Sequence, residues 1–195
     1  MTDKSCTPSS PNPFSHKGRS AERFSKSRGA ANPYYVNSLA DRYSEFGLGP
    51  ERADTMVRLG SVAETAMPIS LHSDMPMAPA DLLFLAWCAA TRKTVSDRVA
   101  APEQKISRDR ALSAITLESA YVIEMEDELG SIKPGKVANF TILEQDPYAV
   151  EVDALKDIPV WGVVPENFPC QPQNLSPLKP RELIKGELAP LTHQR

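Results

Sequence analysis

The most informative stretch of the chain is residues 67–92, in which the pattern of apolar positions changes from that of a strand to that of a buried helix. Residues 69–72 alternate apolar and polar side chains (Ile, Ser, Leu, His), which is the two-residue period of a β-strand, and Pro76 ends the pattern. Residues 82–90 are apolar at every position, as in a helix that neighbouring elements cover on several sides. We therefore expect a strand over residues 67–72 and a buried helix over residues 80–92.

The remaining elements are predicted from the same periods, with glycine, proline and capping residues as their boundaries. Helices are expected over residues 34–46, 50–66 with a bend near Gly60, 107–123 with Ser107 as the N-cap, and 152–156; strands are expected over residues 137–143 and 158–164. A helix that leads directly into a strand is the repeating step of a β/α barrel.

The two ends of the chain have a composition typical of disorder. Residues 1–30 contain six Lys or Arg against two Asp or Glu, and residues 168–195 contain five prolines. Such segments have little apolar surface to bury, so we expect a disordered basic segment over 1–30 and a disordered Pro-rich tail over 168–195. The basic segment lacks the interleaved aromatic residues or the amphipathic helix that nucleic-acid binding or import would require, so no nucleic-acid partner is expected.

Length, charge and cysteine content narrow the class of protein. The chain has 195 residues, a net charge of −3 and 41% hydrophobic residues, which allows a globular core. A complete barrel needs about 250 residues, so we expect only a piece of one. The longest apolar run falls short of a membrane span, which takes about 20 residues. Three isolated cysteines and no apolar leader favour a cytoplasmic protein with no membrane partner.

His72 and Asp74 are the candidates for chemistry. They lie two residues apart at the end of the predicted strand, so their side chains point to one face, at the position of an active site in a β/α barrel. A carboxylate there can ligate a divalent metal and act as a general base. From the spacing alone, a capping role for Asp74 in the following turn or helix is favoured. His72 would orient Asp74 or face substrate, or be an ordinary core or rim residue.

Three motifs follow one another along residues 32–164. They are Asp41-Arg42-Tyr43 with Gly49-Pro50-Glu51-Arg52-Ala53, then His72-Ser73-Asp74, and then Gly130-Ser131-Ile132-Lys133-Pro134-Gly135-Lys136. In this order and spacing they resemble the C-terminal part of the metal-dependent amidohydrolase superfamily, specifically its amidohydrolase family 3 branch.

The resemblance implies an α/β protein. Residues 31–125 would form the last β/α units of a (β/α)8 barrel, and residues 126–167 would form the C-terminal strands of a small β-sandwich. Members of the family use one or two divalent metals to hydrolyse amide-like carbon–nitrogen bonds, including those of N-substituted formamides. In them an Asp at the end of the eighth strand binds the metal and accepts a proton from the attacking water. The resemblance gives Asp74 this catalytic and metal-binding role.

The rest of the family's metal site has no counterpart in the sequence. That site takes a His-x-His pair from the first strand, a Lys or Glu further on and two His from middle strands, whereas this chain has His16, His72 and His193. His72 and Asp74 would supply two ligands, and a zinc site needs at least three protein ligands. We therefore expect the complete enzyme to use a divalent metal, with zinc favoured, and this chain alone to bind none.

These observations predict the C-terminal portion of a truncated amidohydrolase that is inactive as an isolated chain. The complete enzyme would hydrolyse a small-molecule amide or formamide-like substrate at a carbon–nitrogen bond other than a peptide bond. The chain would associate with an N-terminal half chain or with itself. The alternatives are a non-catalytic partner module, or one half of a split hydrolase whose other chain supplies the metal ligands.

Overall fold

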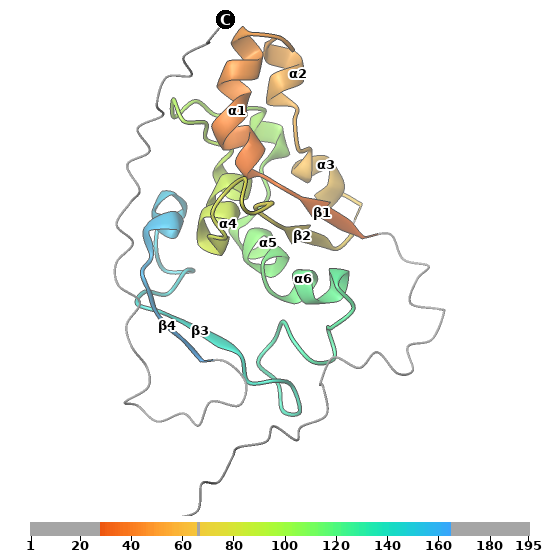
Figure 1. Cartoon of the computed structure of the whole chain (residues 1–195), viewed down its shortest axis with the longest axis vertical. Coiled ribbons are helices and arrows are strands. Elements are labelled where there is room, and N and C mark those ends of the chain that lie inside the picture. Colours follow the sequence, from red (N-terminus) through yellow and green to blue (C-terminus); the bar gives the residue numbers. More distant parts are fainter. Residues whose placement is uncertain (1–27, 66, 165–195) are drawn as a thin grey trace, which may run out of the picture.

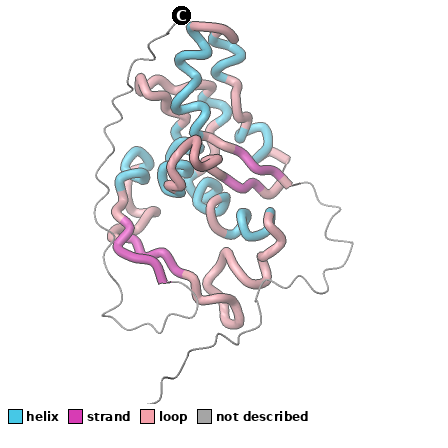
Figure 2. Tube along the Cα trace, viewed as in Figure 1, coloured by secondary structure: helices cyan, strands magenta, loops and turns pink. Residues whose placement is uncertain are grey.

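The computed structural model describes residues 28–65 and 67–164, which form a mixed α/β arrangement (Figure 1). The strands are β1 (Gly29–Ala31), β2 (Ile69–Leu71), β3 (Phe140–Leu143) and β4 (Val160–Val164); the helices are α1 (Tyr34–Glu45), α2 (Pro50–Asp54), α3 (Leu59–Ala63), α4 (Leu82–Thr91), α5 (Arg108–Ala114) and α6 (Leu117–Val122), with 3-10 turns η2 (Pro102–Gln104) and η3 (Val152–Asp157). The strands form two separate pairs (Figure 2).

Strands β1 and β2 form a parallel pair in which Gly29 lies opposite Ile69 and Ala31 lies opposite Leu71. Strand β2 is confirmed, and its alternation is that of the sequence, because Ile69 and Leu71 are buried and Ser70 is only half-buried. Strand β1 corrects the expected boundary of the disordered segment, since an ordered strand already begins at Gly29. The rest of that segment, residues 1–27, and the tail 168–195 lie outside the described residues.

Helix α4 is the centre of the core. It is buried along its length except at Leu82 and Phe84, as the all-apolar sequence predicts. Leu85 and Cys88 on this helix belong to one hydrophobic cluster with Ile69 of β2 and Leu155 of η3. Burying this much apolar surface is the dominant stabilising term, and it fixes β2 against the helices.

The helix expected over residues 50–66 is replaced by two short helices, α2 and α3. The reason is Arg92, which lies at the C-terminal cap of α4 and is 1% exposed. Its guanidinium donates hydrogen bonds to the carbonyl oxygens of Asp54 (2.8 Å), Met56 (2.9 Å) and Val57 (2.9 Å). These carbonyls therefore bind a side chain instead of continuing a helical ladder, and the chain turns at Val57, where φ is 53°.

Gly60 lies within α3 rather than at the predicted bend, and close packing requires a glycine there. A β-carbon on Gly60 would lie 2.5 Å from the carbonyl oxygen of Glu103 and 2.8 Å from Cα of Gln104. Both are backbone atoms, which cannot move aside as a flexible side chain can. The absent side chain thus allows α3 to pack directly on η2.

The helix expected over residues 107–123 is also divided, into α5 and α6. Its predicted start is confirmed, since the hydroxyl of Ser107 accepts a hydrogen bond from the amide of Arg110 at 3.2 Å. The helix ends at Ala114, and Thr116 has φ −129° and ψ −92°, outside the helical region. The break places Glu118 where its carboxylate accepts a hydrogen bond from the amide of Ile69 at 2.7 Å.

The predicted C-terminal strands are present as an antiparallel pair, β3 and β4, in which Phe140 lies opposite Val164. Both strands are shorter than expected, and β4 starts at Val160, immediately after Pro159. The turn of helix predicted over residues 152–156 is η3, and Lys156 lies over the ring of Trp87. No helix among the described residues has the length and apolar character needed to cross a membrane.

Candidate functional site

The carboxyl ends of β1 and β2 bring two distant segments of the chain together. The amide of His72, immediately after β2, donates a hydrogen bond to the carbonyl oxygen of Ala31 at 3.0 Å. Asn32 follows Ala31 directly, so Asn32 and His72 both leave the sheet at the carboxyl ends of their strands. In parallel β/α proteins, ligands bind at the carboxyl ends of the strands. His72 and Asp74, the two candidates from the sequence, lie there.

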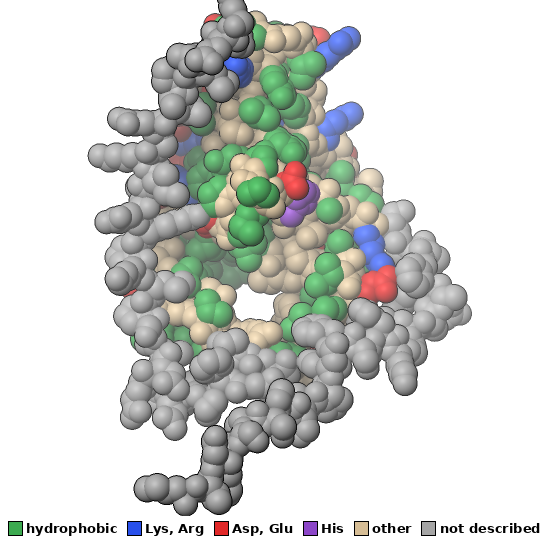
Figure 3. Space-filling view, viewed as in Figure 1, with side chains coloured by type: hydrophobic (Ala, Val, Ile, Leu, Met, Phe, Trp, Pro, Cys, Tyr) green, Lys and Arg blue, Asp and Glu red, His purple; other side chains and the backbone are tan. Residues whose placement is uncertain are grey.

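His72 and Asp74 are both exposed, and Ser73 between them is buried. This alternation agrees with the prediction that the two side chains point to one face. Asp74 has φ 55°, and its carbonyl oxygen accepts a hydrogen bond from the amide of Met77 at 2.8 Å, which closes a turn. Figure 3 shows the imidazole beside an acidic side chain on this surface, bordered by apolar side chains.

Asp81, rather than Asp74, caps the helix that follows. Its carboxylate accepts a hydrogen bond from the amide of Phe84 at 3.1 Å and so begins α4. The hydrogen bond made by the Asp74 carboxylate within the described part of the chain is of a different kind, since Oδ2 accepts it from the hydroxyl of Tyr35 at 3.3 Å. The helix-capping alternative for Asp74 is therefore not the arrangement observed.

Tyr35 and Asn32 are site residues that the sequence did not reveal. Tyr35 is half-buried in the first turn of α1. Burial raises the pKa of its hydroxyl above the ordinary value, and the negative charge of Asp74 and the hydrogen bond to it raise this pKa further. Asn32 is 4% exposed, and its Oδ1 accepts a hydrogen bond from the amide of Tyr34 at 3.0 Å.

The amide nitrogen of the Asn32 side chain, Nδ2, is buried and has no hydrogen-bond partner among the described residues. A buried donor without a partner is uncommon, because its desolvation is then uncompensated. Nothing in the local sequence indicates this environment, since it depends on the pairing of β1 with β2.

A divalent metal needs more ligands than the residues at the carboxyl ends of β1 and β2 provide. Within residues 28–65 and 67–164 there is no group of three or more His, Cys, Asp or Glu side chains arranged to hold one. His72 and Asp74 have the donor chemistry that zinc accepts, but a zinc site takes three or four protein ligands. His16 and His193 lie outside the described residues. The described side chains alone therefore do not fit a complete metal site.

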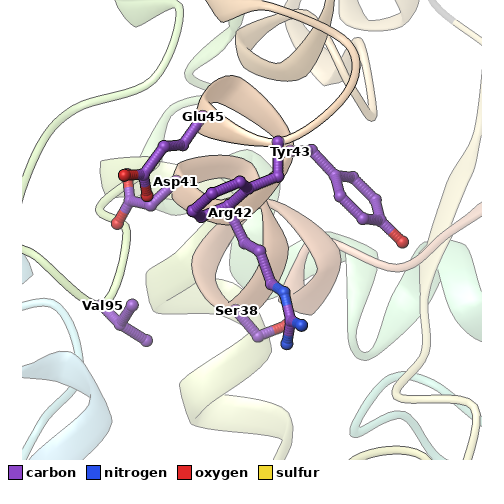
Figure 4. A pocket seen from close by; sticks show the side chains of 7 residues that line it. Ser38, Asp41, Arg42, Tyr43, Glu45 and Val95 are labelled. Atoms are coloured by element: carbon purple, nitrogen blue, oxygen red, sulfur yellow. The ribbon is translucent and has the colours of Figure 1, made fainter.

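A separate hollow lies along α1 and does not include His72 or Asp74 (Figure 4). Its lining residues are Ser38, Asp41, Arg42, Tyr43, Glu45, Phe46 and Val95. Asp41 is already engaged, because it forms an ion pair with Arg98 at 3.1 Å and accepts a hydrogen bond from the hydroxyl of Ser96 at 2.8 Å. Phe46 and Val95 are largely exposed, so this open surface offers no enclosed place for a reaction.

Comparison with known proteins finds relatives that are named as hydrolases. It is 29% identical over 100 residues to an N-substituted formamide deformylase of Arthrobacter pascens, a match that covers 51% of this chain and 18% of that enzyme. The crystal structure of an uncharacterized metal-dependent hydrolase from Pyrococcus horikoshii OT3 is similar in fold, with a TM-score of 0.54 and 24% identity over 67% of this chain and 26% of that one.

A second uncharacterized metal-dependent hydrolase, from Pyrococcus furiosus, matches with a TM-score of 0.44 and 26% identity over 58% of this chain and 22% of that one. The chain thus spans about a quarter or less of the length of these relatives. A model of the amidohydrolase family matches residues 14–167, which is most of the sequence and includes β1, β2 and the candidate site residues that follow them. The chain belongs to the amidohydrolase family.

Proposed function

We propose that this chain provides the last strand-end carboxylate, Asp74, of a hydrolase that acts on carbon–nitrogen bonds other than peptide bonds. The observation that carries the proposal is the position and exposure of Asp74. It is an exposed carboxylate at the carboxyl end of a parallel strand, and Asp81, not Asp74, caps the following helix. Family membership and the similarity to an N-substituted formamide deformylase support amides or formamides as the class of substrate.

In this proposal Asp74 is the proton acceptor. An ionised carboxylate beside a water molecule can remove a proton from that water as it attacks a carbonyl carbon, and it can return the proton to the leaving nitrogen. His72 is also exposed, at the carboxyl end of the same strand, and would hydrogen-bond to the substrate or orient the carboxylate. The described residues lack a complete ligand set for the metal that the family is expected to use, so the reaction requires groups from outside them.

We propose that those groups come from a further polypeptide segment that packs on this one, either in a longer chain or as the other half of a split hydrolase. Two features support such a partner. Strand β1 pairs with β2 alone among the described strands, so no described strand pairs with its other edge, and an unpaired strand edge accepts a further strand readily. Met75, Met77 and Leu82, in the segment that follows Asp74, are also 70%, 41% and 49% exposed. A non-catalytic partner module would use the same surfaces without chemistry.

The metal content of the purified full chain tests this proposal. After loading with zinc and dialysis, the chain should retain only a small fraction of an equivalent, because affinity depends on the number of ligands and their fixed geometry. Elemental analysis of the wild type and of Asp74→Asn, side by side, provides the comparison. Retention of a full equivalent by the wild type, lost in Asp74→Asn, would show that this chain holds a complete metal site and would refute the proposed division of the site.

A further inference from the structure

The hydrogen bond from Tyr35 to Asp74 joins two elements that are far apart in the sequence. Tyr35 belongs to the first turn of α1, whereas Asp74 lies in the turn after β2, and their side chains meet at 3.3 Å. Asp74 is exposed and has a positive φ, and the Tyr35 hydroxyl is the group that meets its carboxylate among the described residues. The bond therefore bridges the two strand ends across the candidate site.

Asn32 fixes the place of Tyr35. Its side-chain Oδ1 accepts a hydrogen bond from the amide of Tyr34 at 3.0 Å, and its backbone carbonyl accepts one from the amide of Tyr35 at 3.3 Å. Together these bonds hold the first turn of α1 against the end of β1, as N-terminal caps do. Asn32 is itself buried. The ring of Tyr35 thus extends from a fixed backbone rather than from a mobile loop.

We propose that Tyr35 is a positioning residue for Asp74, and that its hydroxyl holds the carboxylate in the single orientation in which it accepts a proton. This inference rests on the proposed function, which gives Asp74 that role. An exposed aspartate ordinarily exchanges among its staggered rotamers, and a proton acceptor that does so spends much of its time misaligned. The Tyr35 hydroxyl donates to an ionised carboxylate at 3.3 Å, and this contact favours the Asp74 rotamer that makes it.

The test uses NMR on the full chain. Three-bond couplings at Asp74 report its χ1 rotamer. We expect one dominant Asp74 rotamer in the wild type and averaged couplings in Tyr35→Phe, which removes only the hydroxyl.

The neighbouring Tyr34 supplies the matched control. It packs against the ring of Phe84 with 5.5 Å between ring centroids, so Tyr34→Phe should leave the Asp74 couplings as in the wild type. Averaged Asp74 couplings already in the wild type, or unchanged couplings in Tyr35→Phe, would overturn the proposal. The coupling measurement does not depend on turnover, so failure of the proposed hydrolysis would leave its result standing and would be recognised separately.

Discussion

Asp74→Asn should lower kcat/KM by about a thousandfold in an active enzyme that contains this segment, because asparagine has a similar shape but neither charge nor the ability to accept a proton. The enzyme is made by grafting residues 28–164 onto the N-terminal part of a full-length amidohydrolase that hydrolyses N-substituted formamides. The graft begins at residue 28 because β1, which pairs with β2, begins at Gly29. His72→Ala should cost less, about 10- to 100-fold.

Asp81→Asn is the matched control for Asp74→Asn, since it makes the same chemical change in the same loop. Asp81 caps α4, and asparagine is as good an N-cap as aspartate, so this variant should keep the rate of the unmodified graft. An Asp74→Asn variant that retains full activity, or an equal loss in Asp81→Asn, would show that Asp74 is not the proton acceptor.

Arg92→Met should lower the free energy of unfolding by about 3 kcal/mol or more. Arg92 is 1% exposed, and besides the carbonyls of Asp54, Met56 and Val57 it binds the carbonyl oxygen of Ala100 at 2.6 Å. Methionine fills much of the same volume but removes the donor to all four carbonyls, of which that of Val57 keeps the amide of Leu59. Urea denaturation followed by tryptophan fluorescence gives the difference in free energy.

Arg58→Met is the control for that measurement. Arg58 is exposed and hydrogen-bonds to the hydroxyl of Ser61 at 3.3 Å on the surface, so its loss should change the free energy of unfolding by less than about 0.5 kcal/mol. Similar values for the two variants would mean that the bonds of Arg92 do not stabilise the break between α2 and α3.

The elements that the sequence predicts well are those with local signals. Helix α4 is apolar throughout, the hydroxyl of Ser107 caps α5 as expected, and β2 shows the alternation of a half-buried strand. Strand β1 has no such signal. It is three small residues, Gly-Ala-Ala, whose strand conformation comes from pairing with a partner about forty residues later, and tertiary contacts of this kind override propensity.

The division of the helix expected over residues 50–66 also comes from tertiary contacts. The sequence from Pro50 onward has helical periodicity, but Arg92, far along the chain, binds the carbonyls that a continuous helix would use. A glycine at position 60 indicated a bend, whereas the structure uses it for close packing against Glu103. Local patterns could not distinguish these uses, because each depends on which segment packs nearby.

The candidate site was predictable in part. Alternation placed His72 and Asp74 on one face, and both are exposed at the strand end. Tyr35 and Asn32 join them only because β1 lies beside β2 in parallel register, which the sequence did not predict. The complete barrel, the β-sandwich, zinc and the catalytic role of Asp74 stay predictions, and the ligand set they require extends beyond the described residues.

The most direct measurement is the hydrolysis of an N-substituted formamide, with added zinc, by the graft of residues 28–164 and by this chain alone at equal concentration. We expect turnover by the graft, because the other part supplies the missing ligands, and none by the chain alone. A graft that folds and binds metal yet does not hydrolyse the substrate would contradict the proposal that this segment carries a working carboxylate. Turnover by the chain alone would contradict the proposal that the site is shared.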